Sequence, residues 1–239
     1  RSGLGSSSSF TVGILNALHG LLGSLKSKQE LAEEAVYLEH KIIQENVGIQ
    51  DQIAAAHGGF NRIDIASDGK FRIEPLPIEV NRLAELEDHL LLIFTGVART
   101  ASDVAEKKIA ALNAKEDALY QMAAMVDVAV DILMSDQDIR RFGELLHQSW
   151  LLKRSITPEI STDLVDGLYD RARNAGAIGG KLLGAGGGGF MLFFVEPEKR
   201  EKVLDALNGY LAVPFGFENN GTHISLYKQG MYPVHRRMD

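Results

Sequence analysis

The sequence predicts an α+β fold, in which helices pack against strands that pair across long separations. Apolar residues recur with helical periodicity over residues 101–134 and 158–174, whereas residues 90–94 and 190–195 are short, apolar and typical of strands. A third observation is a cluster of seven glycines within eleven residues, which leads directly into the second of these strands. Strands separated by long helices indicate two packed layers of secondary structure.

The composition is that of a folded protein. Of the 239 residues, 45% are hydrophobic and 24% are charged, and the 24 glycines exceed the usual share. A net charge of −7 argues against a nucleic-acid partner, and no apolar stretch is long enough for a membrane span. The absence of cysteine excludes disulfides, thiolate metal sites and a cysteine nucleophile. It fits a reducing compartment, so we expect a cytoplasmic protein without a membrane partner.

The first third of the chain is expected to hold two helices followed by two strands. The opening RSGLGSSSS could be a flexible linker, but an apolar helical pattern follows it at once, and serine favours a helix start. That pattern consists of Ile14, Leu15, Leu18, Leu21 and Leu22. A second helix is expected over residues 29–45, and strands over 60–65 and 70–75 with a turn at 67–69.

Pro75 and Pro77, followed by an acidic patch, indicate a change of subdomain, so we expect domains at residues 1–80 and 81–239. The elements expected in the second domain are a strand at 90–94, helices at 101–134, 138–150 and 158–174, a strand at 190–195, a helix at 198–211 and a strand at 223–227. In the third of these helices the aligned apolar residues are Ile160, Leu164, Leu168 and Ala172.

The glycine cluster does not fit the two best-known phosphate-binding loops. Its members are Gly179, Gly180, Gly184, Gly186, Gly187, Gly188 and Gly189. Three of them satisfy the dinucleotide fingerprint, but that loop must open a helix, and this one opens a strand. The P-loop pattern fails because Lys181 is followed by Leu182 instead of Ser or Thr. We therefore expect another backbone or a ligand to approach this loop closely, with a purely structural turn as the alternative.

The Ser-rich start has the chemistry of an anion site. Gly3 and Gly5 free the backbone to direct N–H groups inward, serines offer hydroxyls, and the following helix presents its positive end. A nucleotide phosphate would bring a divalent cation, for which Glu39 is a candidate ligand, the alternative being a solvated helix residue. Asp51 could be a helix cap or a base that orients a substrate hydroxyl.

Three segments in this order resemble motifs of the GHMP small-molecule kinases: GLGSSSS at residues 3–9, GIQDQ at 48–52 and KLLGAGGGGF at 181–190. The resemblance implies a GHMP kinase fold, with the remainder of a ribosomal-protein-S5-like N-terminal domain and a ferredoxin-like C-terminal domain. Residues 1–80 would then be the C-terminal part of the ATP-binding domain, and residues 81–239 the C-terminal domain.

The resemblance also implies roles for individual residues. The phosphate-binding loop would be formed by Gly3, Leu4, Gly5, Ser6, Ser7 and Ser8, with Gly184, Gly186 and Gly187 near the reacting phosphate. Ser7 and Glu39 would hold Mg²⁺, and Asp51 would be the catalytic group on the substrate. Gly59 and Arg99 would contact the substrate, although Arg99 could equally be a surface charge on a helix. Lys153 and Arg154 are expected to be surface or inter-helix contacts.

Within the family, residues 95–102, 150–154 and 177–181 look most like the branch that contains D-glycero-D-manno-heptose 7-phosphate kinases and the kinase part of fucose kinases. The resemblance implies an enzyme that uses ATP and Mg²⁺ on a sugar or sugar phosphate, with a homodimer as a candidate assembly. The alternatives are a kinase of fucose, galactose or an isoprenoid precursor, a silent sugar sensor, or a truncated inactive fragment. The family's first motif does not precede Arg1, so a chain of these residues alone is expected to hold phosphates poorly.

Overall fold

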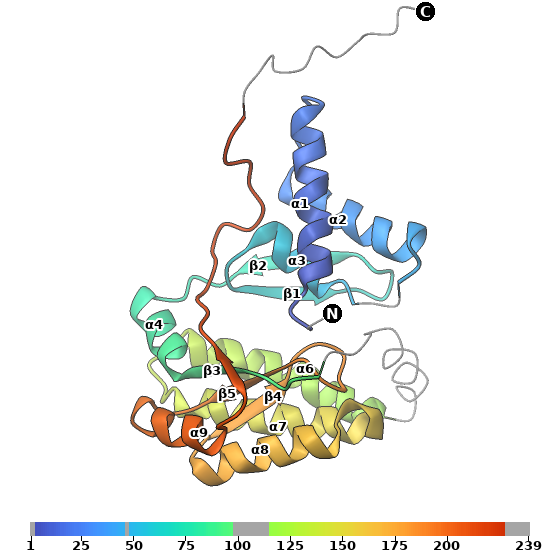
Figure 1. Ribbon diagram of the computed structural model, residues 1–239. Coiled ribbons are helices and arrows are strands. Elements are labelled where there is room, and N and C mark those ends of the chain that lie inside the picture. Colours follow the sequence, from blue (N-terminus) through green and yellow to red (C-terminus); the bar gives the residue numbers. More distant parts are fainter. Residues whose placement is uncertain (1–2, 46–47, 98–114, 228–239) are drawn as a thin grey trace, which may run out of the picture.

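The computed structural model describes residues 3–45, 48–97 and 115–227, which form two layers, each with its own sheet (Figure 1). The first layer contains, in order, α1 (Ser6–Leu21), α2 (Lys28–Tyr37), the π-helix η1 (Leu38–Ile42), α3 (Gln50–His57), β1 (Asn61–Ile65) and β2 (Phe71–Pro75). The two strands form an antiparallel hairpin with Asn61 opposite Pro75. The predicted strands and their connecting turn are therefore confirmed.

The three helices of the first layer pack on one another around a small core. Its fully buried members are Val12, Ala32, Ala35, Ile53 and Ala56, and small side chains allow the helix axes to approach closely. The helix α2 begins with a capping box, in which Ser27 and Glu30 satisfy each other's backbone N–H groups. The second expected helix is thus present, but its last turn is a π-helix.

The helix α1 was predicted correctly, but its buried face was not. Most of the aligned apolar residues are open to solvent, with Ile14, Leu18 and Leu21 exposed by 42%, 48% and 58%. The buried face is instead small and mainly polar, formed by Ser8, Thr11, Val12, Asn16 and Gly20. Periodicity identified the helix, but it could not tell which stripe faces the neighbouring helices.

The second layer is built on a four-stranded antiparallel sheet with strand order β4-β5-β3-β6. The strands are β3 (Leu90–Phe94), β4 (Gly179–Leu182), β5 (Phe190–Phe194) and β6 (Leu211–Val213), and the helices are α4 (Val80–His89), α6 (Glu116–Leu133), α7 (Arg140–Ile156), α8 (Asp163–Ala175) and α9 (Arg200–Ala206). Leu92 of β3 lies opposite Leu192 of β5. The sheet thus joins segments about one hundred residues apart, as expected of an α+β fold.

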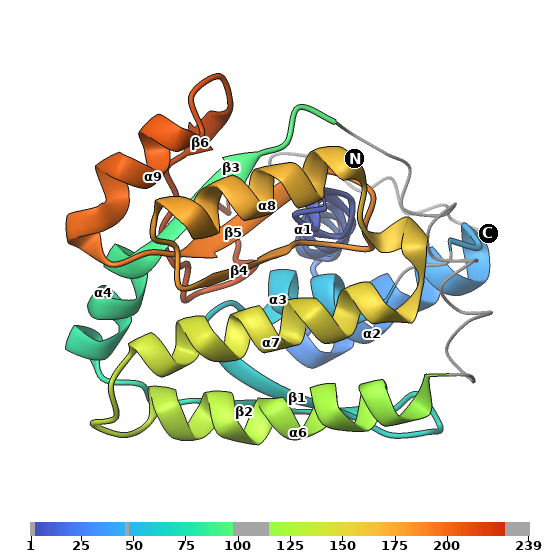
Figure 2. The ribbon, with the colours of Figure 1, turned by 90° about the horizontal axis from the view of Figure 1, so that it is seen from below.

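Helices cover the sheet on the side that faces away from α1 (Figures 1 and 2). The helix α7 packs against β4 and β5, α6 packs on α7, and α8 packs on α9. Trp150, Leu168 and Phe193 are fully buried between them. Burial of such large apolar side chains supplies most of the free energy that holds this layer together.

Several expectations for the second layer were wrong in detail. The segment 158–174 begins with a 3-10 turn at Pro158–Ile160, and in α8 Val165 is buried while Leu164 is 40% exposed. The helix expected at 198–211 is shorter and follows a 3-10 turn at Pro197–Lys199. Residues 223–227 form no strand, and α4 and β4 were not anticipated. Residues 101–114 of the helix expected at 101–134 lie outside the described residues.

Among the helices in the described part of the chain, none is both long and apolar enough to cross a membrane.

Gly179 is predicted to be essential for the packing of α7 on the sheet. A Cβ at this position would lie 1.9 Å from the Gly143 carbonyl oxygen of α7, so Gly179→Ala must push the helix away. We expect a loss of about 3 kcal/mol in the free energy of unfolding, measured with urea. Gly167 of α8 is the matched control, because a Cβ there meets nothing within 4 Å. Gly167→Ala should stabilise the fold by ~0.5–1 kcal/mol, and equal effects of the two variants would contradict this account.

Candidate active site

The three motifs meet at the N-terminal end of α1. A Cβ on Gly184 would lie 2.9 Å from the Cα atom of Gly3, and one on Gly5 would lie 3.0 Å from Cγ of Asp51. Both Gly3 and Gly5 have a positive φ, which any side chain would strain. The glycine cluster thus receives another backbone at close range, as expected, and the loop before α1 runs between that cluster and Asp51.

The first turn of α1 presents backbone N–H groups toward this junction. Gly5 occupies the N-cap position in the left-handed conformation, and no side chain caps the helix. The first intrahelical bond runs from the Ser9 N–H to the Gly5 carbonyl at 2.8 Å. The N–H groups of Ser6, Ser7 and Ser8 precede it, so they have no acceptor within the helix. Together with the helix dipole, they make this turn suitable for a phosphate group.

Glu39 is a buried carboxylate with one oxygen unsatisfied. Its residue is 1% exposed, and Oε2 accepts hydrogen bonds from Ser8 Oγ at 3.1 Å and Gln52 Nε2 at 2.5 Å. Oε1 is buried without a hydrogen-bond partner among the described residues. Glu39 lies in the π-helix η1, a local distortion often found at functional sites. Burying a carboxylate without partners for both oxygens is unfavourable, so this oxygen favours a cation.

Asp51 lies in the first turn of α3 and is not the cap, because Ile49 occupies that position. Its carboxyl keeps one side open to a cavity, yet the residues around it remove enough water to raise its pKa above the ordinary value. The negative charge of Glu39 raises the pKa further. Near Asp51, the Glu39 carboxylate and the Ser8 hydroxyl that donates to it offer oxygen atoms, the ligands that Mg²⁺ prefers.

The structure distinguishes the serines of the loop. Ser8 is buried and donates to Glu39, whereas Ser7 is exposed on the first turn of α1. The Ser7 carbonyl accepts a hydrogen bond from Thr11 Oγ1 at 3.2 Å. The hydroxyl nearest the candidate metal carboxylate is therefore that of Ser8, one residue after the serine chosen from the sequence.

The glycine cluster begins in β4 and continues through the loop that leads into β5. The loop is held by backbone bonds from the Gly187 N–H to the Ile160 carbonyl at 3.0 Å and from the Gly189 N–H to the Val97 carbonyl at 2.8 Å. A Cβ on Gly186 would lie 2.9 Å from the Ile160 Cα. The loop is therefore fixed against two neighbouring segments and presents Gly184 to the start of α1.

Two buried polar side chains fix the glycine loop. One of them is Lys153, for which the expected surface or inter-helix contact was wrong, because its ammonium is buried against the loop backbone. Lys153 is 6% exposed and donates from Nζ to the carbonyls of Leu182 at 2.9 Å and Gly184 at 2.7 Å. Thr95 Oγ1 donates to the Gly189 carbonyl at 2.9 Å. Lys153 follows Trp150 by three residues and so shares its buried helix face, a signal that could have identified it. Its partner in the prediction, Arg154, forms the expected inter-helix contact with Asp166 at 2.9 Å.

A cavity of about 630 Å³ opens beside Asp51. Gly5, Ser9, Asp51 and Gly59 line one part of it, so the predicted substrate residue Gly59 does lie at this cavity. The remaining wall comes from residues 216–223, which the sequence had assigned no role. Arg99, the other predicted substrate residue, lies outside the described residues.

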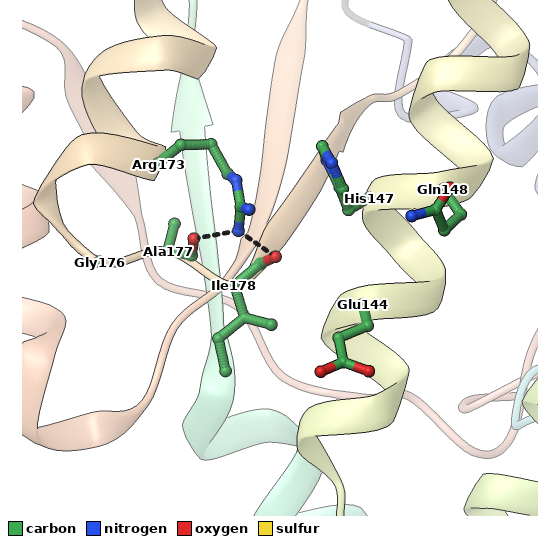
Figure 3. Close-up of a pocket in the computed structure, with 7 residues that line it drawn as sticks. All are labelled: Glu144, His147, Gln148, Arg173, Gly176, Ala177 and Ile178. Carbon is green, nitrogen blue, oxygen red and sulfur yellow. Dashed lines mark hydrogen bonds between the residues drawn. The ribbon is translucent and has the colours of Figure 1, made fainter.

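A second hollow, of about 390 Å³, lies between α7 and the junction of α8 with β4 (Figure 3). Arg173 points inward but donates to the carbonyls of Ala177 and Ile178, and His147 Nδ1 lies 2.6 Å from the Tyr169 hydroxyl. Burial and the charge of Arg173 lower the pKa of His147. These polar groups connect structural elements, and none belongs to the three motifs.

Two family models match the chain. The model described as "GHMP kinases N terminal domain" matches residues 1–59, and the one described as "GHMP kinases C terminal" matches residues 124–213. A D-glycero-alpha-D-manno-heptose 7-phosphate kinase of Campylobacter jejuni is 34% identical over 225 residues, which are 92% of this chain and 66% of that protein. A mevalonate kinase of Pyrococcus horikoshii is 32% identical, covering 86% of this chain and 59% of the relative. The chain thus spans about two thirds or less of these relatives.

Solved structures agree with this assignment. A D-glycero-D-manno-heptose 1-phosphate kinase of Bacteroides thetaiotaomicron superposes with a TM-score of 0.71 at 30% identity, covering 95% of this chain and 65% of the other. A galactokinase of Lactococcus lactis, 20% identical, shares the fold with a TM-score of 0.67 over 92% of this chain and 66% of the other. The motifs, the two family models and the common fold agree, and the chain belongs to the GHMP kinase family.

Proposed function

We propose that this chain carries the phosphoryl-transfer site of an ATP- and Mg²⁺-dependent sugar kinase. The observation that carries the proposal is the convergence of the uncapped first turn of α1, the buried carboxylate of Glu39 and the carboxyl of Asp51. Each of the three parts suits one component of the reaction, namely the phosphates, the cation and the acceptor hydroxyl.

In this proposal, the N–H groups of Ser6, Ser7 and Ser8 bind phosphate oxygens of ATP, and Gly184, Gly186 and Gly187 shape the space beside them. Glu39 and Ser8 would hold Mg²⁺, which when bound neutralises charge on the phosphates. Gly3 and Gly5 allow the loop to approach Gly184 and Asp51 closely, and Leu4 lines the neighbouring cavity.

Asp51 would act on the acceptor. Its carboxylate accepts the proton of a sugar hydroxyl as that oxygen forms a bond to the terminal phosphorus of ATP and the bond to ADP breaks. Burial raises the pKa of Asp51, which makes its carboxylate a better proton acceptor than that of an ordinary aspartate.

For the acceptor, we propose a sugar or sugar phosphate, and specifically D-glycero-D-manno-heptose 7-phosphate. Support comes from the Campylobacter and Bacteroides relatives, whose names specify heptose phosphates. A fucose- or galactose-type sugar is the second candidate, because a bifunctional fucokinase of Arabidopsis thaliana is 26% identical over 85% of this chain and 20% of its own length. A panel of these sugars with labelled ATP distinguishes the two, and a lack of transfer together with a lack of ATP binding would indicate an inactive fragment.

We also propose the division into domains 1–80 and 81–239. In its support, the cluster around Val12 and Ile53 draws only on residues before 80, whereas the four-stranded sheet draws only on residues after it.

Asp51→Asn should lower turnover by about a thousandfold, because the amide cannot take the proton of the acceptor. The measurement is steady-state phosphoryl transfer in the full-length natural protein. Asp136→Asn is the matched control, since Asp136 is exposed and distant in sequence from all three motifs. A turnover of Asp51→Asn within twofold of the wild type would refute the proposed role.

Glu39→Gln should raise the Mg²⁺ concentration needed for the half-maximal rate by at least about tenfold. Mutation of a residue that only hydrogen-bonds a metal ligand already has an effect of this size, and loss of the ligand itself should have a larger one. Without Mg²⁺, the variant should unfold at an equal or higher urea concentration, because a buried charge has been removed. Glu33→Gln on the exposed side of α2 is the control. An unchanged Mg²⁺ requirement would leave Glu39 with a structural role only.

Ser8→Ala and Ser7→Ala test which hydroxyl serves the metal. Because Ser8 donates to Glu39 and Ser7 is exposed, only Ser8→Ala should weaken Mg²⁺ binding measured by titration calorimetry in the presence of an ATP analogue. If Ser7→Ala weakens Mg²⁺ binding and Ser8→Ala does not, Ser7 is the metal ligand, as expected from the sequence.

A further inference from the structure

Residues 216–223, here called the C-terminal wall, cross from the four-stranded sheet to the first layer (Figure 1). Backbone bonds fasten them to the end of α3. The Gly59 N–H donates to the Glu218 carbonyl at 2.7 Å, and the Thr222 N–H donates to the Ala55 carbonyl at 2.9 Å. A Cβ on Gly58 would lie only 2.1 Å from the Gly221 nitrogen. The two glycine-containing segments therefore lie in direct contact.

Side chains from α1 and α2 hold the same segment. Lys28 Nζ donates to the Asn220 carbonyl at 2.6 Å, and Asn16 Nδ2 donates to Thr222 Oγ1 at 3.0 Å. Within the wall, the Glu218 carboxylate accepts from the N–H groups of Asn220 at 2.8 Å and Gly221 at 2.6 Å. Asn16 and Thr222 are 206 residues apart in the sequence, so these bonds are tertiary contacts that give the wall a defined position on the first layer.

The wall faces the Asp51 carboxyl across the 630 Å³ cavity and presents Phe217, Thr222 and His223 to it. The Phe217 ring meets Phe60 edge to face, with centroids 4.6 Å apart, which fixes an aromatic surface. His223 Nδ1 lies 3.3 Å from the Gly221 carbonyl. Since a carbonyl can only accept, Nδ1 carries the proton in this contact, and Nε2 of the neutral ring is left as an acceptor.

The described residues that line this cavity include no lysine or arginine. Besides Phe217, Thr222 and His223, the wall contributes Glu218 to the lining. An aromatic surface with hydroxyl, imidazole and carboxylate groups suits the C–H face and the hydroxyls of a sugar ring, whereas a phosphate would call for cationic donors. The cavity thus fits the polyhydroxylated part of an acceptor.

We propose that the C-terminal wall determines acceptor specificity, with Nε2 of His223 accepting a hydrogen bond from a hydroxyl of a polyhydroxylated ring that lies on Phe217. This inference rests on the proposed kinase function, and it assigns the acceptor side of that site. Lys28 acts as a positioning residue, because it holds the wall without lining the cavity.

The test compares acceptor and ATP kinetics in the full-length natural protein, using whichever of heptose 7-phosphate, fucose and galactose the wild type phosphorylates fastest. His223→Ala should raise the acceptor KM about tenfold, the usual effect of one lost hydrogen bond in a polar pocket, and leave the ATP KM within about twofold. His223→Gln, which retains an acceptor, should recover part of the loss. Lys28→Met should also raise the acceptor KM selectively, because the wall loses its anchor.

Two controls match these variants. Asn219→Ala changes a residue of the wall that does not line the cavity, and Lys26→Met removes a neighbouring lysine that pairs with Glu30 instead. Both should leave the acceptor KM unchanged, with all variants checked for an unaltered urea midpoint. A wild type that transfers phosphate to none of the sugars would contradict the kinase function. An active enzyme whose His223 and Lys28 variants keep the wild-type acceptor KM would overturn the inference alone.

Discussion

The contact between Gly3 and Gly184 is the constraint on which the rest of the site depends. It joins the loop before α1 to the loop between β4 and β5. A Cβ on Gly184 would lie 2.9 Å from the Gly3 Cα, and both glycines have a positive φ that a side chain would strain. Because α1 belongs to the first layer and the glycine loop to the second, this contact brings the two layers together at the candidate phosphate site. A side chain at residue 184 would push the start of α1 away from the loop that Lys153 holds by its bond to the Gly184 carbonyl.

The junction carries negative groups on one side of the α1 start and positive groups on the other, an arrangement that suits the binding of a cation together with an anion. Glu39 and Asp51 bring negative charge to one side of the α1 start, while the helix dipole and the Lys153 ammonium bring positive charge to the other. Burial raises the pKa of Asp51, and the negative charge of Glu39 raises it further. The buried and unsatisfied Oε1 of Glu39 is therefore better explained by metal binding than by stability, because a neutral side chain would be easier to bury.

The sequence was most informative where backbone geometry limits the residue type. Close approach favours glycine at residue 184 and a positive φ favours it at residue 3, and the loop that opens a strand was recognisable from FMLFFV after it. The sequence was least informative where tertiary packing decides which side chains are buried. The polar face of α1 is buried because Ser8 pairs with Glu39 and Asn16 pairs with Thr222, and both partners lie far away in the chain. Periodicity is a local property, so it could not choose Ser8 over Ser7 or foresee the C-terminal wall.

In the proposed function, the phosphates and the acceptor are bound by different segments of the chain, so the acceptor side can change while the phosphate side is kept. The phosphate side is built from α1, the glycine loop and Glu39, where close backbone contacts leave little freedom to change residues. The acceptor side includes an irregular segment attached mainly through backbone bonds and two anchoring side chains, so its exposed side chains can change without moving the rest. The heptose 1-phosphate kinase and the galactokinase whose structures superpose on this chain share its fold. A fixed phosphate site beside a replaceable wall is a physical arrangement that permits this variety, because specificity resides in the site and not in the fold.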